Sequence, residues 1–367
     1  MKRENCMNIK EFLRYATDIL KAAKIETPVL EAGVVLCFVL KCDRTYLYSH
    51  DDRVLQKAEI EALNDMLGQR ANNVPLQYLV GETEFMSLSF VVSPAVLIPR
   101  QDTEILVERC IKLVTGMSIP RQEQIAVQNA NAKYNAGASI NANAKYNTGA
   151  SISASAKYDT GANAKNNINP NTSVNGNINP NANANDNDKR DEITADGKVK
   201  VLDMCTGSGC VAISIAHYCP DSIVVACDVS RDALCIAKAN SERNRVQNRL
   251  KLRWGDLFEA LDGERGFDII VSNPPYIETS IMPELQKEVR DHEPHLALDG
   301  GNDGLDFYRK ITAMAPSYLI NGGYLAFEIG YNQGQSVKSL MQECFKDIEI
   351  CKDISGNDRV VIGRFYK

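Results

Sequence analysis

The sequence lacks the features that mark membrane proteins and most zinc proteins. No stretch approaches the roughly 18 consecutive apolar residues of a membrane-spanning helix. The eleven cysteines include no CxxC pair, and the motif "HEPH", which contains His292 and His295, does not have the HExxH spacing of a zinc-binding helix. We therefore expect buried, reduced thiols, no metal site and no association with a membrane.

Basic charge is also scarce, since the 367-residue chain carries a formal net charge of -6. Proteins bind duplex nucleic acid mainly by placing Lys and Arg on phosphates, so this balance argues against a direct nucleic acid partner. The first residues, "MKRENCMNIKEF", have neither the apolar core of a secretory signal nor the acid-poor composition of a transit peptide. We expect a cytoplasmic protein, and a chain of this length can form more than one domain.

Residues 1–75 predict a small all-helical domain. Apolar residues in "NIKEFLRYATDILKAAKI" recur with the helical period, and Thr27 followed by Pro28 is typical of a helix start. From residue 76 the sequence "LQYLVGETEFMSLSFVVSPAVLIP" becomes rich in aromatic and branched side chains. This change predicts a β-hairpin linker over residues 76–100.

Residues 116–195 are a low-complexity segment rich in Asn and Ala. Three 12-residue units, "NAKYNAGASINA", "NAKYNTGASISA" and "SAKYDTGANAKN", follow one another from residue 131. Large apolar side chains are nearly absent, so burial cannot offset the entropy lost on ordering the segment. We expect a disordered insert, and a short-period β-helix or an Asn-rich assembly tract is the alternative.

Strand and helix patterns alternate in the rest of residues 101–367. Apolar strand-like runs such as "KVKVLDM", "SIVVACD" and "FDIIVSN" are separated by helical patterns, and the last two strand patterns lie close enough to form a hairpin. This alternation predicts an α/β, doubly wound, Rossmann-like sheet that is mostly parallel, with an antiparallel strand near its end.

The segment "VLDMCTGSGCVAISIA" predicts a cofactor site. An apolar strand leads into a turn with Gly207 and Gly209 and then into a helix, which lets backbone N–H groups approach a nucleotide-like ligand. Asp228 closes the next strand, where a carboxylate accepts hydrogen bonds from ribose hydroxyls; a helix N-cap is the alternative for this residue. Asp256 follows the third strand and is a candidate acceptor for an adenine amino group, with Leu257 against the ring. These residues alone do not distinguish NAD from S-adenosylmethionine.

The segment "DIIVSNPPYIE" predicts the site of chemistry, because Asn273 ends a buried strand at the edge where ligands bind. Pro274 and Pro275 fix their own φ angles and have no N–H, so the loop offers acceptors without competing donors. The Asn273 side-chain oxygen and the Pro274 carbonyl can therefore accept both hydrogens of one planar NH2 group, while Tyr276 packs on the planar group. Alignment of such an NH2 group with an activated methyl favours N-methylation.

Taken with their flanks, these motifs resemble the PrmC/HemK family, the N(5)-glutamine methyltransferases of peptide chain release factors. The resemblance rests on "LIPRQDTE", "LDMCTGSG", "SNPPYIE" and "EVRDHEPHLALDGGNDGLDFY" and covers nearly the whole chain except the insert. It implies methyl transfer from S-adenosylmethionine to the glutamine of the Gly-Gly-Gln motif in class I release factors by a monomer, with the helical domain helping to dock the release factor. The alternatives are an amino-methyltransferase acting on adenine in DNA or RNA, since "NPPY" is shared with such enzymes, and an NAD-dependent oxidoreductase.

The resemblance also assigns residues. The substrate loop is Asn273, Pro274, Pro275 and Tyr276, of which Asn273 and Pro274 are catalytic. The cofactor residues are Cys205, Thr206, Gly207, Ser208, Gly209, Asp228 on the ribose, Asp256 and Leu257 at the adenine, and Asn273.

Two positions depart from the family pattern. Cys205 stands where the family usually has Gly, and we expect cofactor binding to survive if the backbone there has φ below zero. Gln101 stands where the family often has Pro. Relatives have only a short loop in place of the insert, which should therefore lie on the surface, away from the carboxyl ends of the strands.

We predict that deletion of residues 120–190 spares both folding and enzymatic activity. Loop closure depends weakly on length, and a sixteen-fold longer loop costs only about 2.4 kcal/mol, at roughly 0.6 kcal/mol per doubling. Thermal unfolding and methyl transfer of the deletion variant, compared with the full chain, provide the measurement. Collapse of folding would show that the segment is structural.

Overall fold

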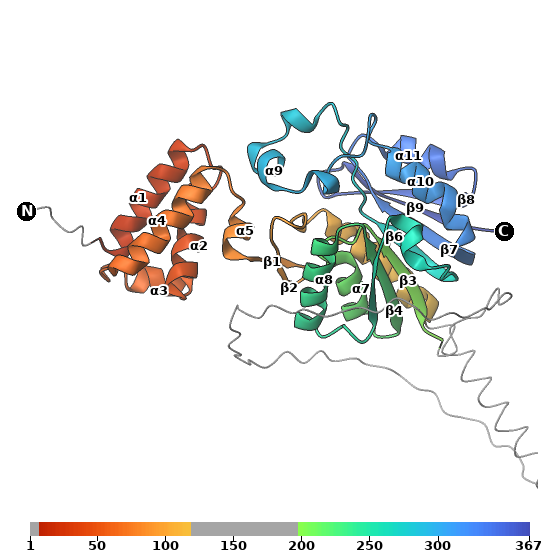
Figure 1. Cartoon of the computed structure of the whole chain (residues 1–367), viewed down its shortest axis with the longest axis horizontal. Coiled ribbons are helices and arrows are strands. Elements are labelled where there is room, and N and C mark those ends of the chain that lie inside the picture. Colours follow the sequence, from red (N-terminus) through yellow and green to blue (C-terminus); the bar gives the residue numbers. More distant parts are fainter. Residues whose placement is uncertain (1–6, 119–196) are drawn as a thin grey trace, which may run out of the picture. The chain divides into compact units, whose positions relative to one another are not determined.

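The computed structural model describes residues 7–118 and 197–367 (Figure 1). The predicted insert over residues 116–195 lies outside this part of the chain, except for residues 116–118, which continue a helix. None of the helices in the two described ranges is long and apolar enough to cross a membrane. The cysteines in these ranges are free; Cys235 and Cys344 are exposed, and five others are buried.

The N-terminal residues form helices, as their periodicity predicts. The first begins with a reciprocal cap, since the Asn8 side chain accepts from the Glu11 backbone N–H and the Glu11 carboxylate accepts from that of Asn8. The second begins at Pro28, although Thr27 makes no side-chain cap bond. The helices are α1 (Ile9–Ala22), α2 (Pro28–Leu40), α3 (Arg44–Ser49) and α4 (Lys57–Ala71), and they enclose a core that includes Phe12, Leu36 and Leu63.

The segment predicted as a hairpin linker begins with one turn of helix. Helix α5 (Leu76–Val80) ends at Gly81, whose φ of +81° suits a glycine at a helix terminus. The hairpin follows as β1 (Glu82–Phe85) and β2 (Leu88–Val91), which pair antiparallel. A helix over residues 103–118 comes next.

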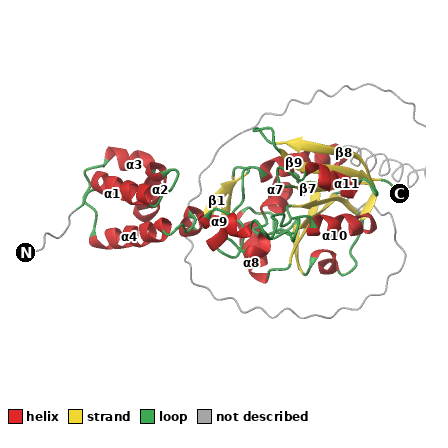
Figure 2. Cartoon of the chain, turned by 90° about the horizontal axis from the view of Figure 1, so that it is seen from above, coloured by secondary structure: helices red, strands yellow, loops and turns green. Residues whose placement is uncertain are grey.

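The C-terminal part is a seven-stranded sheet with the strand order β5-β4-β3-β6-β7-β9-β8. Figure 2 labels three of its strands, β7, β8 and β9. The five neighbouring strands from β5 to β7 pair in parallel, and β9 pairs antiparallel with β7 and β8. The predicted mostly parallel sheet with a C-terminal hairpin is therefore confirmed. The strands are β3 (Val199–Met204), β4 (Ser222–Asp228), β5 (Leu250–Trp254), β6 (Phe267–Ser272), β7 (Leu319–Glu328), β8 (Phe345–Lys352) and β9 (Asp358–Phe365). The α-helices are α7 (Cys210–Tyr218), α8 (Arg231–Arg243), α9 (Lys287–His292), α10 (Asp306–Met314) and α11 (Gly334–Met341), with short 3-10 turns at Leu257–Leu261, Met282–Glu284, His295–Ala297 and Ala315–Ser317.

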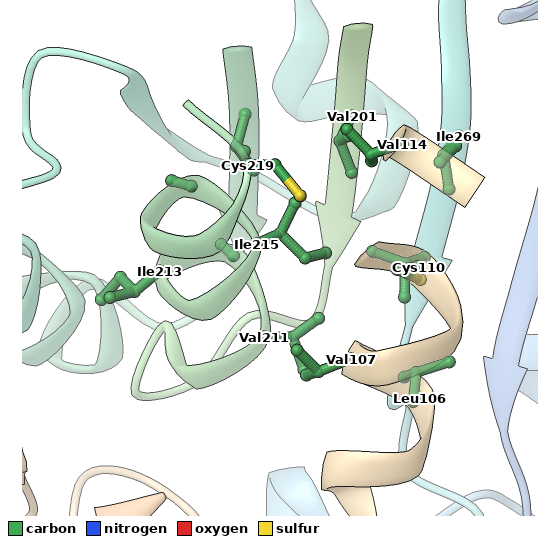
Figure 3. Close-up of a cluster of buried hydrophobic side chains, with 14 of the residues drawn as sticks. Leu106, Val107, Cys110, Val114, Val201, Val211, Ile213, Ile215, Cys219 and Ile269 are labelled. Carbon is green, nitrogen blue, oxygen red and sulfur yellow. The ribbon is translucent and has the colours of Figure 1, made fainter. Parts of the chain in front are cut away.

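Two hydrophobic cores cover the two faces of this sheet. Because side chains alternate along a strand, Val201 belongs to one core and Leu202 to the other, and the same holds for Ile269 and Ile270. Helix α7 and residues 103–118 pack on the first face, where Figure 3 shows Val114 close to Val201 and Ile269. Helices α10 and α11 contribute to the second. The apolar runs of the central strands follow from burial on both sides.

The strand order places a ligand edge at β3 and β6. These strands are adjacent, and the chain leaves β3 toward β4 but leaves β6 toward β7, which is the switch point where open α/β sheets bind ligands. The helix over residues 103–118 begins at this edge, since Thr103 lies next to Asn273, whereas Val114 packs near the amino-terminal half of the strands. The chain resumes directly before β3. The described residues that flank the undescribed segment therefore lead away from the ligand edge.

Asn240 connects the hairpin, helix α8 and the turn after β3. Its side chain is fully buried; Oδ1 accepts from the Val91 N–H at 2.6 Å, and Nδ2 donates to the carbonyls of Val91 at 3.0 Å and Ser208 at 2.9 Å. The amide thus pairs with β2 as a neighbouring strand would.

We predict that Asn240→Ala lowers the free energy of unfolding by about 3 kcal/mol, because buried backbone groups lose their partners. Urea denaturation checks this value. The exposed Asn248 is the control, and Asn248→Ala should change stability by less than about 0.5 kcal/mol. Equal effects of both substitutions would contradict the role of Asn240.

Candidate active site

A pocket lies among the loops that follow β3, β4, β5 and β6, at the ligand edge of the sheet. Further parts of its wall come from residues 95–100, Thr103, Pro294, Leu296, Ala297 and Phe307. The lining residues that the sequence predicts for the site are Cys205, Thr206, Gly207, Ser208, Asp228, Asp256, Leu257, Asn273 and Pro275. Three further predicted residues, Gly209, Pro274 and Tyr276, do not line the pocket but adjoin residues that do.

The turn between β3 and α7 is held closed by backbone and side-chain bonds. The Thr206 N–H donates to the Cys227 carbonyl at 3.0 Å, and the Gly209 N–H donates to the Thr206 carbonyl at 2.8 Å. Gly209 has φ of +80°, and a Cβ there would lie 2.9 Å from Cδ1 of Ile213. Glycine is therefore required at this position both by the backbone conformation and by the close approach of the helix.

Asp203, in strand β3, stabilises the turn between β3 and α7. Its Oδ2 accepts from the Thr206 hydroxyl at 2.6 Å and from the Ala212 N–H at 3.2 Å, which joins the turn to the start of α7. Burial raises the pKa of Asp203 to about 7, although these two hydrogen bonds lower it. This buried carboxyl group was not singled out from the sequence, where it is one polar residue in an apolar strand.

Cys205 does not have the negative φ on which the expected cofactor binding depends. Its φ is +59°, in the left-handed region, rather than below zero. The turn uses left-handed residues at 205, 207 and 209, and two of these are glycines. A residue with a Cβ costs about 1–2 kcal/mol in this region. Cys205 still lines the pocket, so the strain lies in the cofactor turn itself.

Asp228 ends β4 and faces the pocket. Its Oδ2 accepts from the Gly207 N–H and its Oδ1 from the Ser230 N–H, each at 2.8 Å. Burial raises the pKa of Asp228, while these backbone bonds lower it. The N-cap of α8 is Ser230, whose side chain accepts from the Ala233 N–H, so the alternative of an Asp228 N-cap is wrong. Each carboxylate oxygen keeps a second lone pair, which suits the two hydroxyls of a ribose.

Asp256 and Leu257 follow β5 at the side of the pocket. Asp256 precedes the short 3-10 turn but makes no capping bond with its side chain, which leaves the carboxylate able to accept from a ligand. Leu257 has φ of +47°, a second strained residue in the pocket wall. Asp228 and Asp256 thus provide carboxylate acceptors at two places in one pocket.

Asn273 follows β6 and lines the pocket. Its Nδ2 lies 3.4 Å from the Thr103 hydroxyl oxygen, so the amide nitrogen faces the protein. Within the described residues no donor reaches the carbonyl of Pro274. The side-chain oxygen of Asn273 and this carbonyl are thus two neighbouring acceptors for which residues 7–118 and 197–367 provide no hydrogen-bond donor.

The loop that contains these acceptors is held in place by Gln333 and by the glycine-rich segment over residues 298–304. The Gln333 Nε2 donates to the Tyr276 carbonyl at 3.0 Å, and the Ile277 carbonyl accepts from the Gly300 N–H at 2.8 Å. A Cβ at Gly300 would lie 2.7 Å from the Cα of Tyr276, and one at Gly304 would clash with the Tyr276 carbonyl. The segment "LDGGNDG" therefore needs these glycines because it packs directly on the backbone of residues 275–276.

The sequence motifs assign no role to part of the pocket wall. Arg100 and Leu296 line the pocket, and Arg100 forms an ion pair with Glu293, whose carboxylate is buried. Burial raises the pKa of Glu293, while Arg100 lowers it. The ion pair connects the start of the helix over residues 103–118 to the segment after α9, two regions almost 200 residues apart. In the sequence, only the motifs "LIPRQDTE" and "DHEPH", which contain Arg100 and Glu293, indicate these two regions.

This sheet order, with a glycine-containing turn after β3 and an Asn-Pro-Pro-Tyr loop after β6, defines a Rossmann-like methyltransferase. Residues 191–302 match the family described as methyltransferase small domain, and residues 11–81 match the PrmC N-terminal domain. The chain is 33% identical to a release factor glutamine methyltransferase of Clostridium acetobutylicum over 359 residues, covering 97% of this chain and 98% of the relative. It is 34% identical to one of Geobacter sulfurreducens, covering 97% and 96%. The chain belongs to the release factor glutamine methyltransferase family.

We predict that Cys205→Gly unfolds with a free energy about 1 kcal/mol higher than Cys205→Ala, because glycine removes the strain that any Cβ causes at this positive φ. The comparison with alanine separates backbone strain from loss of the thiol. Urea denaturation with equal m values for the two variants provides the measurement. Greater stability of the alanine variant would contradict the assigned strain.

Proposed function

We propose that the chain transfers the methyl group of S-adenosylmethionine to the side-chain amide nitrogen of the glutamine in the Gly-Gly-Gln motif of class I release factors. The membership of the family supports this reaction. The observation that carries it is a pair of acceptors at the edge of the cofactor pocket, the Asn273 side-chain oxygen and the Pro274 carbonyl, which have no donor among the described residues.

These acceptors match the electronic demand of the reaction. An amide nitrogen is a poor nucleophile because its lone pair is delocalised into the carbonyl group. The two N–H bonds of the substrate amide donate to Asn273 and Pro274, and these hydrogen bonds orient its NH2 group. The two acceptor oxygens also stabilise the positive charge that develops on the amide nitrogen during attack. The sulfonium of the bound cofactor supplies an activated methyl group. The chain's contribution is to hold the nucleophile in line with that methyl group.

The cofactor residues are assigned by position. We propose that Asp228 accepts the ribose hydroxyls, that Asp256 accepts the adenine amino group, and that Leu257 contacts the ring. The turn over residues 205–209 lies against the remainder of the cofactor. Pro275 closes the pocket beside Asn273, and Tyr276 packs on the planar amide of the substrate.

The release factor is the proposed partner, and the helical domain over residues 1–75 is proposed to help dock it. Exposed apolar side chains of α2, Val29, Leu30 and Phe38, provide contact area on that domain. We further propose that the enzyme acts as a cytoplasmic monomer and binds no nucleic acid directly.

We predict that Asn273→Ala lowers the rate of methyl transfer by a factor on the order of 100 or more, comparable to the loss of one preorganised polar contact. The affinity for S-adenosylmethionine should remain largely intact, because Asp228 and Asp256 are unchanged. Single-turnover transfer of a labelled methyl group to purified release factor, with cofactor binding by calorimetry, measures both.

Near-normal turnover by the Asn273→Ala variant would refute the role of Asn273. The same assay with adenine-containing DNA and RNA tests the alternative reaction. Label that enters only nucleic acid would reject the proposed substrate.

A further inference from the structure

Glu328 is a buried carboxyl group beside the proposed substrate loop. It is the last residue of β7, and it is 2% exposed. Ser272 of β6 pairs with Phe327 of β7 in the parallel register, so the next residues, Asn273 and Glu328, lie side by side at the ends of adjacent strands. Glu328 does not line the pocket.

The Glu328 carboxylate lies against groups that donate hydrogen bonds. Hydrogen bonding by the Thr103 hydroxyl and the Asn273 amide lowers the pKa of Glu328, and so does the charge of Arg359 of β9. Tyr308 of α10 donates to the Glu328 backbone carbonyl at 2.9 Å. Oε2 of Glu328 accepts no hydrogen bond from any described residue.

These contacts determine which way the Asn273 amide faces. An ionised carboxylate only accepts hydrogen bonds, so the amide must present its NH2 group to Glu328, and the contact of Nδ2 with the Thr103 oxygen has the same direction. The oxygen of Asn273 is then left for the pocket. The oxygen and NH2 ends of an amide are nearly equal in shape, so without these partners the Asn273 amide could also adopt the flipped orientation. The flipped amide would direct its own NH2 group at the NH2 group of the substrate.

We propose that Glu328, acting with Thr103, is a positioning residue that fixes the amide orientation of Asn273 and thereby makes Asn273 an acceptor for the substrate. The proposal rests on the function proposed above for Asn273. Glu328 acts through Asn273 rather than on the reacting atoms.

The proposal predicts that kcat depends on pH through the ionisation of Glu328. Burial raises the pKa of Glu328 to about 7, although Thr103 and Arg359 lower it. Below that pH the protonated group can donate to the Asn273 oxygen, which favours the flipped amide, so kcat should fall as pH falls through about 7. The other titratable groups around Glu328 are Asp102 before the helix over residues 103–118, Tyr276 in the substrate loop, Tyr308 of α10 and Cys210 of α7.

The experiment measures kcat and KM for release factor, together with the dissociation constant of S-adenosylmethionine, in four variants. Glu328→Gln keeps the shape but supplies an NH2 group, and it should lower kcat about 10- to 100-fold with cofactor affinity within about 2-fold of wild type. Its kcat should also lose the decline near pH 7. The pKa of Asp203 is likewise raised to about 7, but any decline that Asp203 causes persists in this variant.

Thr103 provides a matched pair of substitutions. Thr103→Val removes only the hydroxyl and should lower kcat about 5- to 10-fold, whereas Thr103→Ser keeps the hydroxyl and should restore most of it. Thr312→Val is the control, because the buried Thr312 hydroxyl has no hydrogen-bond partner among the described residues and lies outside the pocket. It should leave kcat unchanged.

Each outcome decides the proposal. It is overturned if Glu328→Gln has the kcat and pH profile of wild type, if Thr103→Val and Thr103→Ser behave alike, or if kcat falls only with cofactor affinity. Should Glu328→Gln fail to fold, the Thr103 pair decides. Absence of transfer to release factor by the wild-type protein would instead reject the proposed function.

Discussion

The site depends on the parallel pairing of β3, β6 and β7, because this pairing brings their carboxyl ends to one edge. The cofactor turn follows β3, Asn273 follows β6, and Glu328 ends β7. A shift of register by one residue would turn Asn273 from the pocket and move every apolar side chain of β6 to the opposite core. The two hydrophobic cores therefore fix the chemistry as well as the fold, since they are what holds the register.

Close packing on the backbone is the second constraint. The absence of a Cβ at Gly209 lets helix α7 pack closely on the turn. The absence of a Cβ at Gly300 and Gly304 lets their loop pack closely on the backbone of residues 275–276. Cys205 adopts a positive φ although it has a side chain, and this conformation strains the backbone of the turn. Preorganisation of this kind keeps polar groups in place before substrate arrives, which is the main way a protein accelerates a transfer from an already activated donor.

Local signals in the sequence predicted much of this arrangement. The order of strands and helices, the turn with Gly207 and the position of Asn273 directly after β6 all follow from periodicity and turn chemistry. The φ of Cys205 could not be predicted, because nothing in the local sequence distinguishes a strained left-handed residue from an ordinary one. Glu328 could not be placed beside Thr103 and Asn273, since that proximity arises from strand order between residues far apart in the chain. The part of the wall formed by Pro294, Leu296 and Ala297 was missed for the same reason.

The most direct test of the proposed chemistry locates the transferred methyl group. Purified class I release factor is incubated with the enzyme and S-adenosylmethionine, digested, and analysed by tandem mass spectrometry of the peptide that contains Gly-Gly-Gln. One methyl group on the glutamine side-chain amide is the predicted result. An unmodified glutamine, or a methyl group on another residue, would contradict the proposal that Asn273 and Pro274 present a glutamine NH2 group to the cofactor.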